Sequence, residues 1–235
     1  MRRGAGCLLT ERYPQRPFRA PDDAIEVVLV RHGASAAAVP GEPFPLLDGH
    51  GDPPLAPEGE AQARAVAERL AGAAIDALFV TPLRRTRETA APLAARLGLE
   101  PSVVPDLREV HLGAWETGEY RIRMARGDPL ALRTLTEERW DVLPGAEAMD
   151  AFAARVRRGL RAVVDAVGPG ATAVAVVHGG VIGELCRQAT LSRPFAFVGA
   201  DNASLTRLVV LPGGQQLLRT FNDTAHLERL PASPA

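Results

Sequence analysis

The chain has 235 residues, and all 27 of its basic residues are arginine, because the sequence contains no lysine. This composition excludes a lysine nucleophile, a Schiff-base lysine and a Walker-type lysine, but it leaves phosphate binding by arginine forks open. The formal net charge of −1 argues against a nucleic-acid-binding surface. Two cysteines, Cys7 and Cys186, do not form a disulfide framework, and no apolar run is long enough to span a membrane.

In chain order, residues 1–23 have basic side chains without a sustained apolar run, so we expect a flexible N-terminal arm and no signal peptide. Residues 24–222 are expected to form a single α/β domain, and residues 223–235 a C-terminal tail. A cytoplasmic location is the default for such a chain, because its cysteines show no sign of an oxidising compartment.

Residues 25–30 (IEVVLV) form a continuous apolar, β-branched run, which is typical of a strand buried on both faces of a parallel sheet. Residues 34–54 are rich in Pro, Gly and Ala and predict a long loop. Thr81 is the expected N-cap and Pro82 the first residue of a helix, and residues 106–130 are expected to be irregular. The patterns predict strands over residues 25–30, 75–80, 101–105, 171–177, 203–211 and 215–221, and helices over residues 57–72, 82–97, 147–167 and 179–190.

This alternation of strands and helices predicts an α/β fold with three α/β/α layers and a mostly parallel central sheet. Ligands of such sheets bind at the carboxyl ends of the strands. His32 and His178 each follow a buried strand, and each precedes a glycine, which lets backbone N–H groups approach an anion closely. The two histidines therefore predict an anion site at this edge of the sheet.

Five segments together resemble the signature of the histidine phosphatase superfamily, which has the phosphoglycerate-mutase-like fold. They cover much of residues 25–211 in the family's order. The matching segments are residues 31–33 (RHG), 52–55 (DPPL), 81–90 (TPLRRTRETA), 107–116 (LREVHLGAWE) and 176–180 (VVHGG).

The resemblance implies a role for each matching residue. His32 would be the nucleophile that forms a phosphohistidine, since a neutral imidazole attacks without an activating lysine. Arg31 and Arg85 would hold the phosphoryl oxygens, with His178 as a further donor. Glu109 would be the general acid and then the base, with Glu116 as the alternative. No metal or cofactor is implied.

Other residues have weaker assignments. Ser35 matches a family position that often contacts the phosphate, and Gly179 would offer its backbone to the phosphate. Arg121, Arg123 and Arg126 are candidates for substrate selection. We expect no catalytic role for several other polar or aromatic residues. These are the surface arginines Arg84 and Arg87, the loop histidines His50 and His111, the surface histidine His226, the packing tryptophan Trp115 and the core thiol Cys186.

The resemblance implies a metal-independent phosphomonoesterase, a histidine acid-type phosphatase that hydrolyses a small phosphorylated metabolite. Two alternatives remain: a cofactor-dependent phosphoglycerate mutase, and a non-catalytic phosphate-binding module. The mutase would need a second anion site, which the three arginines at 121, 123 and 126 could supply. The substrate and the oligomeric state stay open, with a homodimer among the states considered, and no nucleic-acid or membrane partner is expected.

Overall fold

A six-stranded sheet lies at the centre of the protein, and the computed structural model describes residues 13–228 and 230 of the chain. The strand order is β5-β4-β6-β1-β7-β8, with parallel pairing from β5 to β1 and antiparallel pairing from β1 to β8. The sheet is therefore mostly parallel, as predicted. Its strands are β1 (Ile25–Arg31), β4 (Ala77–Val80), β5 (Ser102–Val103), β6 (Thr172–Val177), β7 (Leu205–Val210) and β8 (Gln216–Asp223).

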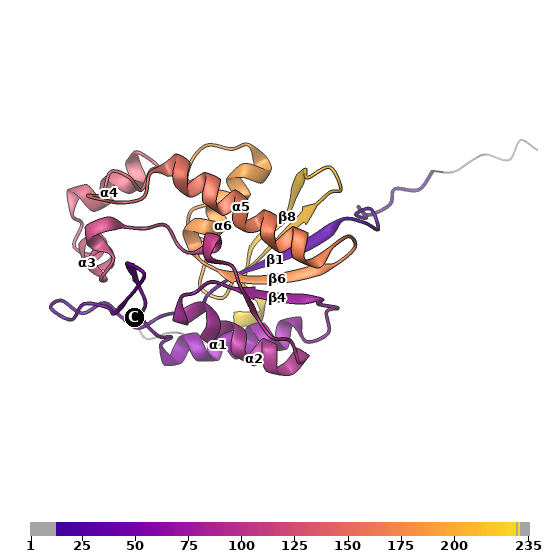
Figure 1. Ribbon diagram of the computed structural model, residues 1–235, viewed down its shortest axis with the longest axis horizontal. Helices are drawn as coiled ribbons and strands as arrows, with labels where there is room; N and C mark the ends of the chain where they lie inside the picture. Colours follow the sequence, from indigo (N-terminus) through magenta and orange to yellow (C-terminus); the bar gives the residue numbers. More distant parts are fainter. Residues whose placement is uncertain (1–12, 229, 231–235) are drawn as a thin grey trace, which may run out of the picture.

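Helices cover both faces of the sheet (Figure 1), which confirms the three-layer architecture. Alternate side chains of β1 point to opposite faces, so that Val28 and Val30 pack towards one helix pair while Val27 and Leu29 pack towards the other. Burial on both faces explains the continuous apolar run of this strand. The helices are α1 (Pro57–Leu70) and α2 (Arg84–Leu97) on one face, and α5 (Met149–Val167) and α6 (Gly179–Thr190) on the other.

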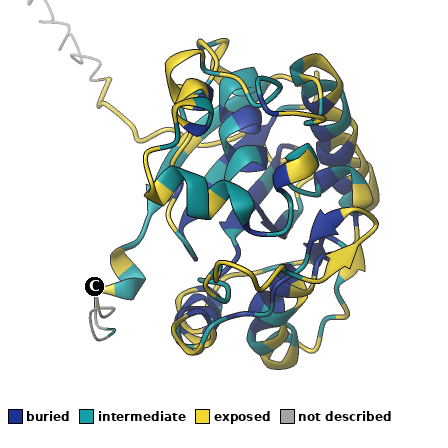
Figure 2. Ribbon diagram, turned by 90° about the vertical axis from the view of Figure 1, so that its left-hand side faces the viewer, coloured by how far each residue is buried: buried dark blue, intermediate teal, exposed yellow. Residues whose placement is uncertain are grey.

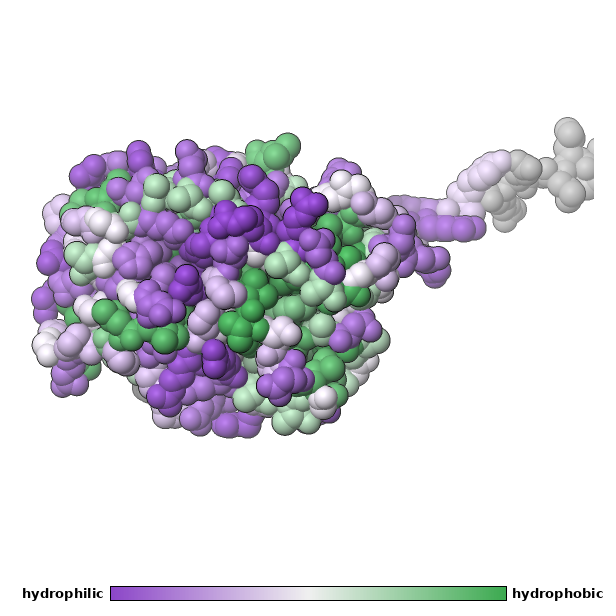
Figure 3. Space-filling model, viewed as in Figure 1, coloured by the Kyte–Doolittle hydropathy of each residue, from purple (hydrophilic) through white to green (hydrophobic). Residues whose placement is uncertain are grey.

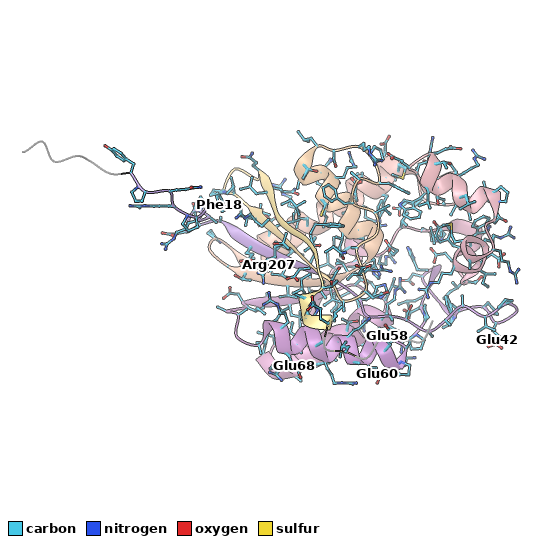
Figure 4. All side chains as sticks on the ribbon, turned by 180° about the vertical axis from the view of Figure 1, so that it is seen from behind. Phe18, Glu42, Glu58, Glu60, Glu68 and Arg207 are labelled. Carbon is cyan, nitrogen blue, oxygen red and sulfur yellow. The ribbon has the colours of Figure 1, made fainter. Side chains whose placement is uncertain are left out.

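The burial pattern in Figure 2 follows these layers, with the strands inside and the exposed residues on the outer sides of the helices. Figure 4 labels Glu58, Glu60 and Glu68, the three acidic residues of α1, all of which are exposed. The face in Figure 3 is mostly hydrophilic, and its apolar residues are scattered in small groups. Among the described residues, no helix is long and apolar enough to cross a membrane.

The expectation that residues 106–130 are irregular is wrong. This part of the chain contains short 3-10 turns and helix α3 (Glu119–Ala125), and helix α4 (Pro129–Thr136) begins at its end. A local signal marks α4, because Asp128 caps it by accepting hydrogen bonds from two backbone N–H groups and a proline follows at the first helical position. Helices α3 and α4 lie beyond the carboxyl ends of the strands (Figure 1).

Several predicted boundaries differ from those observed. Helix α2 begins at Arg84 and not at Pro82, because Leu83 has an extended backbone. The Thr81 hydroxyl accepts a hydrogen bond from the Leu83 N–H over 3.3 Å and also bonds to the Thr86 and His178 side chains. Helix α5 begins at Met149 and not at Glu147, whose backbone N–H donates to the His111 carbonyl. Helix α1 ends at Leu70, before the predicted stop at residue 72.

Residues 13–20 have no regular secondary structure and lead away from the body of the molecule (Figure 1). The first twelve residues of the predicted arm lie outside the described residues. At the other end, β8 extends to Asp223, and a 3-10 turn (Ala225–Leu227) packs against α1. The domain therefore continues past residue 222. His226 is half-buried rather than on the surface, with its Nε2 atom 3.0 Å from the Ala203 carbonyl.

Candidate active site

The carboxyl ends of β1 and β6 bring the two predicted histidines together. Arg31 pairs with Val177 in the parallel register of these strands, so the residues that follow them, His32 and His178, lie side by side. Their ring centroids are 5.2 Å apart. A pocket of about 300 Å³ opens at this edge, and the residues that line it include Arg31, His32, Arg85, Glu109, Arg121 and Gly179.

The His32 side chain is buried, and hydrogen bonding determines which of its ring nitrogens is free. Its Nδ1 atom lies 2.8 Å from the Gly33 carbonyl, which can only accept, so Nδ1 carries the proton in the neutral ring. The Nε2 lone pair then faces Arg85, whose Nε donates to it over 3.2 Å. Burial, followed by the charges of Arg85 and Arg31, lowers the pKa of His32 well below its usual value. The ring is therefore neutral at pH 7.

His178 is completely buried at the start of α6. Its Nε2 atom lies 3.0 Å from the Thr81 hydroxyl, and its Nδ1 atom has no hydrogen-bond partner among the described residues. Burial, together with the charges of Arg85 and of His32, lowers its pKa well below the usual value. Thr81 thus orients His178, a role that sequence reasoning missed because it treated this threonine as a helix cap.

Two arginines flank His32, and backbone carbonyls hold both of them. Arg31 Nη1 donates to the Ala200 carbonyl, and Arg85 Nη1 donates to the Gly51 carbonyl over 2.8 Å. Burial lowers the pKa of each guanidinium, while the Glu109 charge raises it. The buried Arg31 Nε atom has no partner among the described residues. A pair of desolvated cations with unused donors is suited to binding an anion.

The two candidate acids have different environments. Glu109 lines the pocket and accepts from the backbone N–H groups of Val110 at 3.0 Å and Gly180 at 3.2 Å. A Cβ atom at Gly180 would lie only 2.5 Å from Glu109 Oε1, so glycine is required for this approach. Glu116 uses both carboxylate oxygens, at 2.7 Å each, to hold the backbone N–H groups of Gly51 and Leu112.

Of the three arginines predicted to select the substrate, only Arg121 lines the pocket. Its guanidinium donates to the Ser35 hydroxyl and to the Ala36 carbonyl. Burial of this group, with the charges of Arg85 and Arg31, lowers the pKa of Arg121 to about 10, so it stays protonated at neutral pH. Ser35 does not line the pocket itself but anchors Arg121.

Arg123 and Arg126 lie outside the pocket, contrary to expectation. Arg123 forms ion pairs with Glu119 and Asp128 at 2.6 and 3.0 Å, and it stacks on the Trp115 ring. Arg126 is exposed at the end of α3. Positions two residues apart point to different sides of a helix, which separates Arg123 from Arg121.

Further residues position the loop after β1, and sequence reasoning gave them no role. Gly33 N–H donates to the Thr89 hydroxyl over 2.9 Å, and Asn202 donates to the His32 carbonyl over 2.9 Å. Thr89 lies in a matched motif, which was the available signal, whereas nothing in the sequence pointed to Asn202. Among the described residues, no group of three or more His, Cys, Asp or Glu side chains could hold a metal ion. Cys186 is a buried core thiol, with its pKa raised to about 12 by burial.

Comparison with known proteins agrees with this fold. The histidine phosphatase superfamily (branch 1) matches residues 27–224, and the chain belongs to this family. Phosphoglycerate mutase-like protein 4 of Arabidopsis thaliana is 33% identical over 212 residues, which cover 88% of each chain.

Two solved structures illustrate the range of enzymes with this fold. A mycobacterial glucosyl-3-phosphoglycerate phosphatase is 29% identical, with a TM-score of 0.67 and coverage of 86% of this chain and all of the other. A phosphoserine phosphatase from Entamoeba histolytica is 23% identical, with a TM-score of 0.69 and coverage of 86% and 99%, and it supports the fold alone. The superfamily and these structures place the chain among phosphatases.

Proposed function

We propose that the protein is a metal-independent phosphomonoesterase that hydrolyses a small phosphorylated metabolite through a phosphohistidine on His32. The observation that carries the proposal is the state of His32: its Nδ1 proton is held by the Gly33 carbonyl, and its Nε2 lone pair faces the arginines that would bind the phosphate. Burial and the charges of Arg85 and Arg31 lower the pKa of His32, which keeps this nucleophile neutral at pH 7. An acid-type phosphatase is part of the same proposal.

In the first step, His32 Nε2 forms a bond to phosphorus as the bond from phosphorus to the leaving oxygen breaks. Arg31 and Arg85, which line the pocket, stabilise the charge on the phosphoryl oxygens. His178 does not line the pocket, but its ring lies 5.2 Å from that of His32 and its Nδ1 atom has no partner among the described residues, so it serves as a further donor in the proposal. Arg121 adds a third cation at this end of the pocket, since its charge also acts on His32. Glu109 in its protonated form gives its proton to the leaving alkoxide.

In the second step, the Glu109 carboxylate takes a proton from water, and the resulting hydroxide attacks phosphorus as the bond to His32 Nε2 breaks. Inorganic phosphate leaves, and Glu109 is protonated again, so the proton balance closes. Both carboxylates line the pocket, and both oxygens of each accept backbone N–H groups. Glu109 is better suited to this role because its hydrogen bonds are longer, at 3.0 and 3.2 Å against 2.7 Å, and because its charge acts on both Arg31 and Arg85.

A mutase is less well supported by the geometry, although relatives carry that name. The second anion site that it requires was expected from three arginines, of which Arg123 is paired with carboxylates and Arg126 is exposed outside the pocket. Only Arg121 remains, and it lies towards the phosphoryl end.

The proposal is tested with p-nitrophenyl phosphate in buffer containing EDTA. We expect turnover by the wild-type protein, none above background by His32→Ala, and a phosphorylated His32 trapped after acid-free quenching of the reaction. Equal turnover by His32→Ala, or loss of activity in EDTA, would refute the mechanism. Interconversion of phosphoglycerates that requires 2,3-bisphosphoglycerate priming would point to the mutase instead.

A further inference from the structure

The pocket is polar at the phosphoryl end and apolar where a leaving group would lie. Beyond the arginines and His32, it is lined largely by aliphatic and aromatic side chains. These residues are Phe44, Pro53, Val110, Leu112, Trp115, Tyr120, Trp140, Val198 and Ala200.

Three of these residues form a continuous aromatic wall, which we define as Trp115, Tyr120 and Trp140. Consecutive ring centroids are 6.4 and 5.9 Å apart. Phe195 packs against Trp140 at 4.7 Å from outside the pocket and supports the wall. Tyr120 and Trp140 are only half-buried, so part of each ring remains open to a ligand.

The polar groups of this region are already engaged within the protein. The Tyr120 hydroxyl lies 2.9 Å from the Thr134 hydroxyl, and both oxygens of Glu116 accept backbone hydrogen bonds. His50 is the exception, because it lines the pocket and its buried Nε2 atom has no partner among the described residues. A leaving group with many hydroxyls would therefore lose hydrogen bonds to water without replacement.

We infer that the natural substrate is a phosphomonoester of an apolar alcohol, most favourably one with an aromatic or planar group. This inference rests on the proposed function. Burial of the apolar part of the leaving group against the aromatic wall makes the free energy of binding more favourable, and ring stacking adds to this effect. The phosphoryl group supplies all of the charge that the arginines require.

The first experiment compares 2-phenylethyl phosphate with glycerol 3-phosphate, two alkyl esters whose alcohol leaving groups need the same protonation. We expect kcat/KM to be at least roughly tenfold higher for 2-phenylethyl phosphate, mainly through KM. An equal or higher value for glycerol 3-phosphate, or for 3-phosphoglycerate, would overturn the inference while leaving the phosphatase intact. Absence of His32-dependent hydrolysis of every ester would overturn the proposed function and the inference with it.

The second experiment removes the wall. The preference is the ratio of kcat/KM for 2-phenylethyl phosphate to kcat/KM for glycerol 3-phosphate. Trp140→Ala should lower this ratio by about tenfold, and Trp140→Phe should retain most of it. Val198→Asn changes a second apolar residue of the pocket without removing a ring, and it should reduce the same preference by roughly threefold. Leu135→Ala is the control, an exposed apolar residue of α4 that does not line the pocket. An unchanged preference in both Trp140→Ala and Val198→Asn, or a loss in Leu135→Ala, would contradict the inference.

Discussion

At the scale of single residues, hydrogen bonds within the protein separate two carboxylates that look alike in the sequence. Both line the pocket, but Glu116 joins Gly51 to Leu112 through two hydrogen bonds of 2.7 Å, whereas the bonds to Glu109 are longer, at 3.0 and 3.2 Å. The proposed proton donor and the carboxylate that joins two loops are only seven residues apart.

Glu109→Gln should slow phosphoenzyme formation from alkyl phosphates by about 10²-fold or more, because these leaving groups need the proton. The loss should be smaller with p-nitrophenyl phosphate, whose leaving group departs as a stable anion. Single-turnover kinetics on both esters measure the difference. Glu116→Gln is the matched variant, and we expect lower thermal stability with similar relative losses on the two esters. A leaving-group-dependent loss in Glu116→Gln would reverse the assignment.

Thr81 is a positioning residue, because its hydroxyl bonds to His178 Nε2 inside the core. Thr81→Val keeps the volume but removes this bond, and we expect kcat to fall by roughly tenfold with KM nearly unchanged. Thr81→Ser should restore kcat, since it restores the hydroxyl. A purely structural role would instead lower the melting temperature and leave kcat normal in the folded protein.

At the scale of elements, the loop after β1 lies directly against the first turn of α1. A Cβ atom at Gly33 would lie 2.5 Å from the Gly59 carbonyl oxygen, and one at Gly59 would lie 2.0 Å from the Ala34 carbonyl oxygen. Ala34 N–H also donates to the Gln62 side chain over 2.8 Å. The close packing at Gly59 and the hydrogen bond to Gln62 therefore hold the loop that carries His32.

Gly59→Ala tests this contact. In an ordinary helix the change stabilises the protein by about 0.5–1 kcal/mol, but here overpacking should destabilise it by about 1–3 kcal/mol. We expect a lower midpoint in urea unfolding together with reduced kcat, because the displaced segment adjoins His32. Gly72→Ala is the control, since a Cβ atom there meets nothing within 4 Å. Equal stability of Gly59→Ala and Gly72→Ala would contradict this prediction, because it would show that the loop moves away from the added methyl group at no cost in free energy.

At the scale of the whole molecule, His32 and His178 are buried as neutral rings with strongly lowered pKa values. In the unfolded chain they would protonate near the ordinary histidine pKa of about 6.5, so below that pH the unfolded state binds more protons than the folded state. The contribution of the two histidines to the free energy of unfolding is therefore fully present above about pH 6.5 and decreases as the pH falls below it.

We expect the free energy of unfolding to decrease between pH 7 and pH 5, with each of these histidines contributing up to about 1.4 kcal/mol per pH unit. Urea unfolding at several pH values measures the slope. His178→Gln should have a shallower slope than the wild type over this range, whatever its absolute stability, because one titrating group has been removed. Parallel slopes would mean that His178 does not contribute to the acid sensitivity. The cytoplasmic location and the homodimer stay predictions at this scale.

Much of the fold was predictable from local patterns. The apolar runs, the order of strands and helices, and the two histidines at strand ends are properties of neighbouring residues, because the central strands β1 and β6 bury both faces. The absence of lysine likewise meant that arginine had to bind any phosphate. Arg31 and Arg85 could be assigned to phosphate binding because Arg31 adjoins His32 and Arg85 lies in the motif that follows Pro82.

Only the tertiary structure decided which residues face the pocket. Arg121 and Arg123 are indistinguishable by composition, yet one lies in the site and the other is neutralised by two carboxylates. The aromatic wall joins residues of three separate segments, and Thr81 reaches a histidine 97 positions away. The direction of a side chain depends on helix phase and on contacts between segments distant in sequence, and a single sequence does not record these contacts.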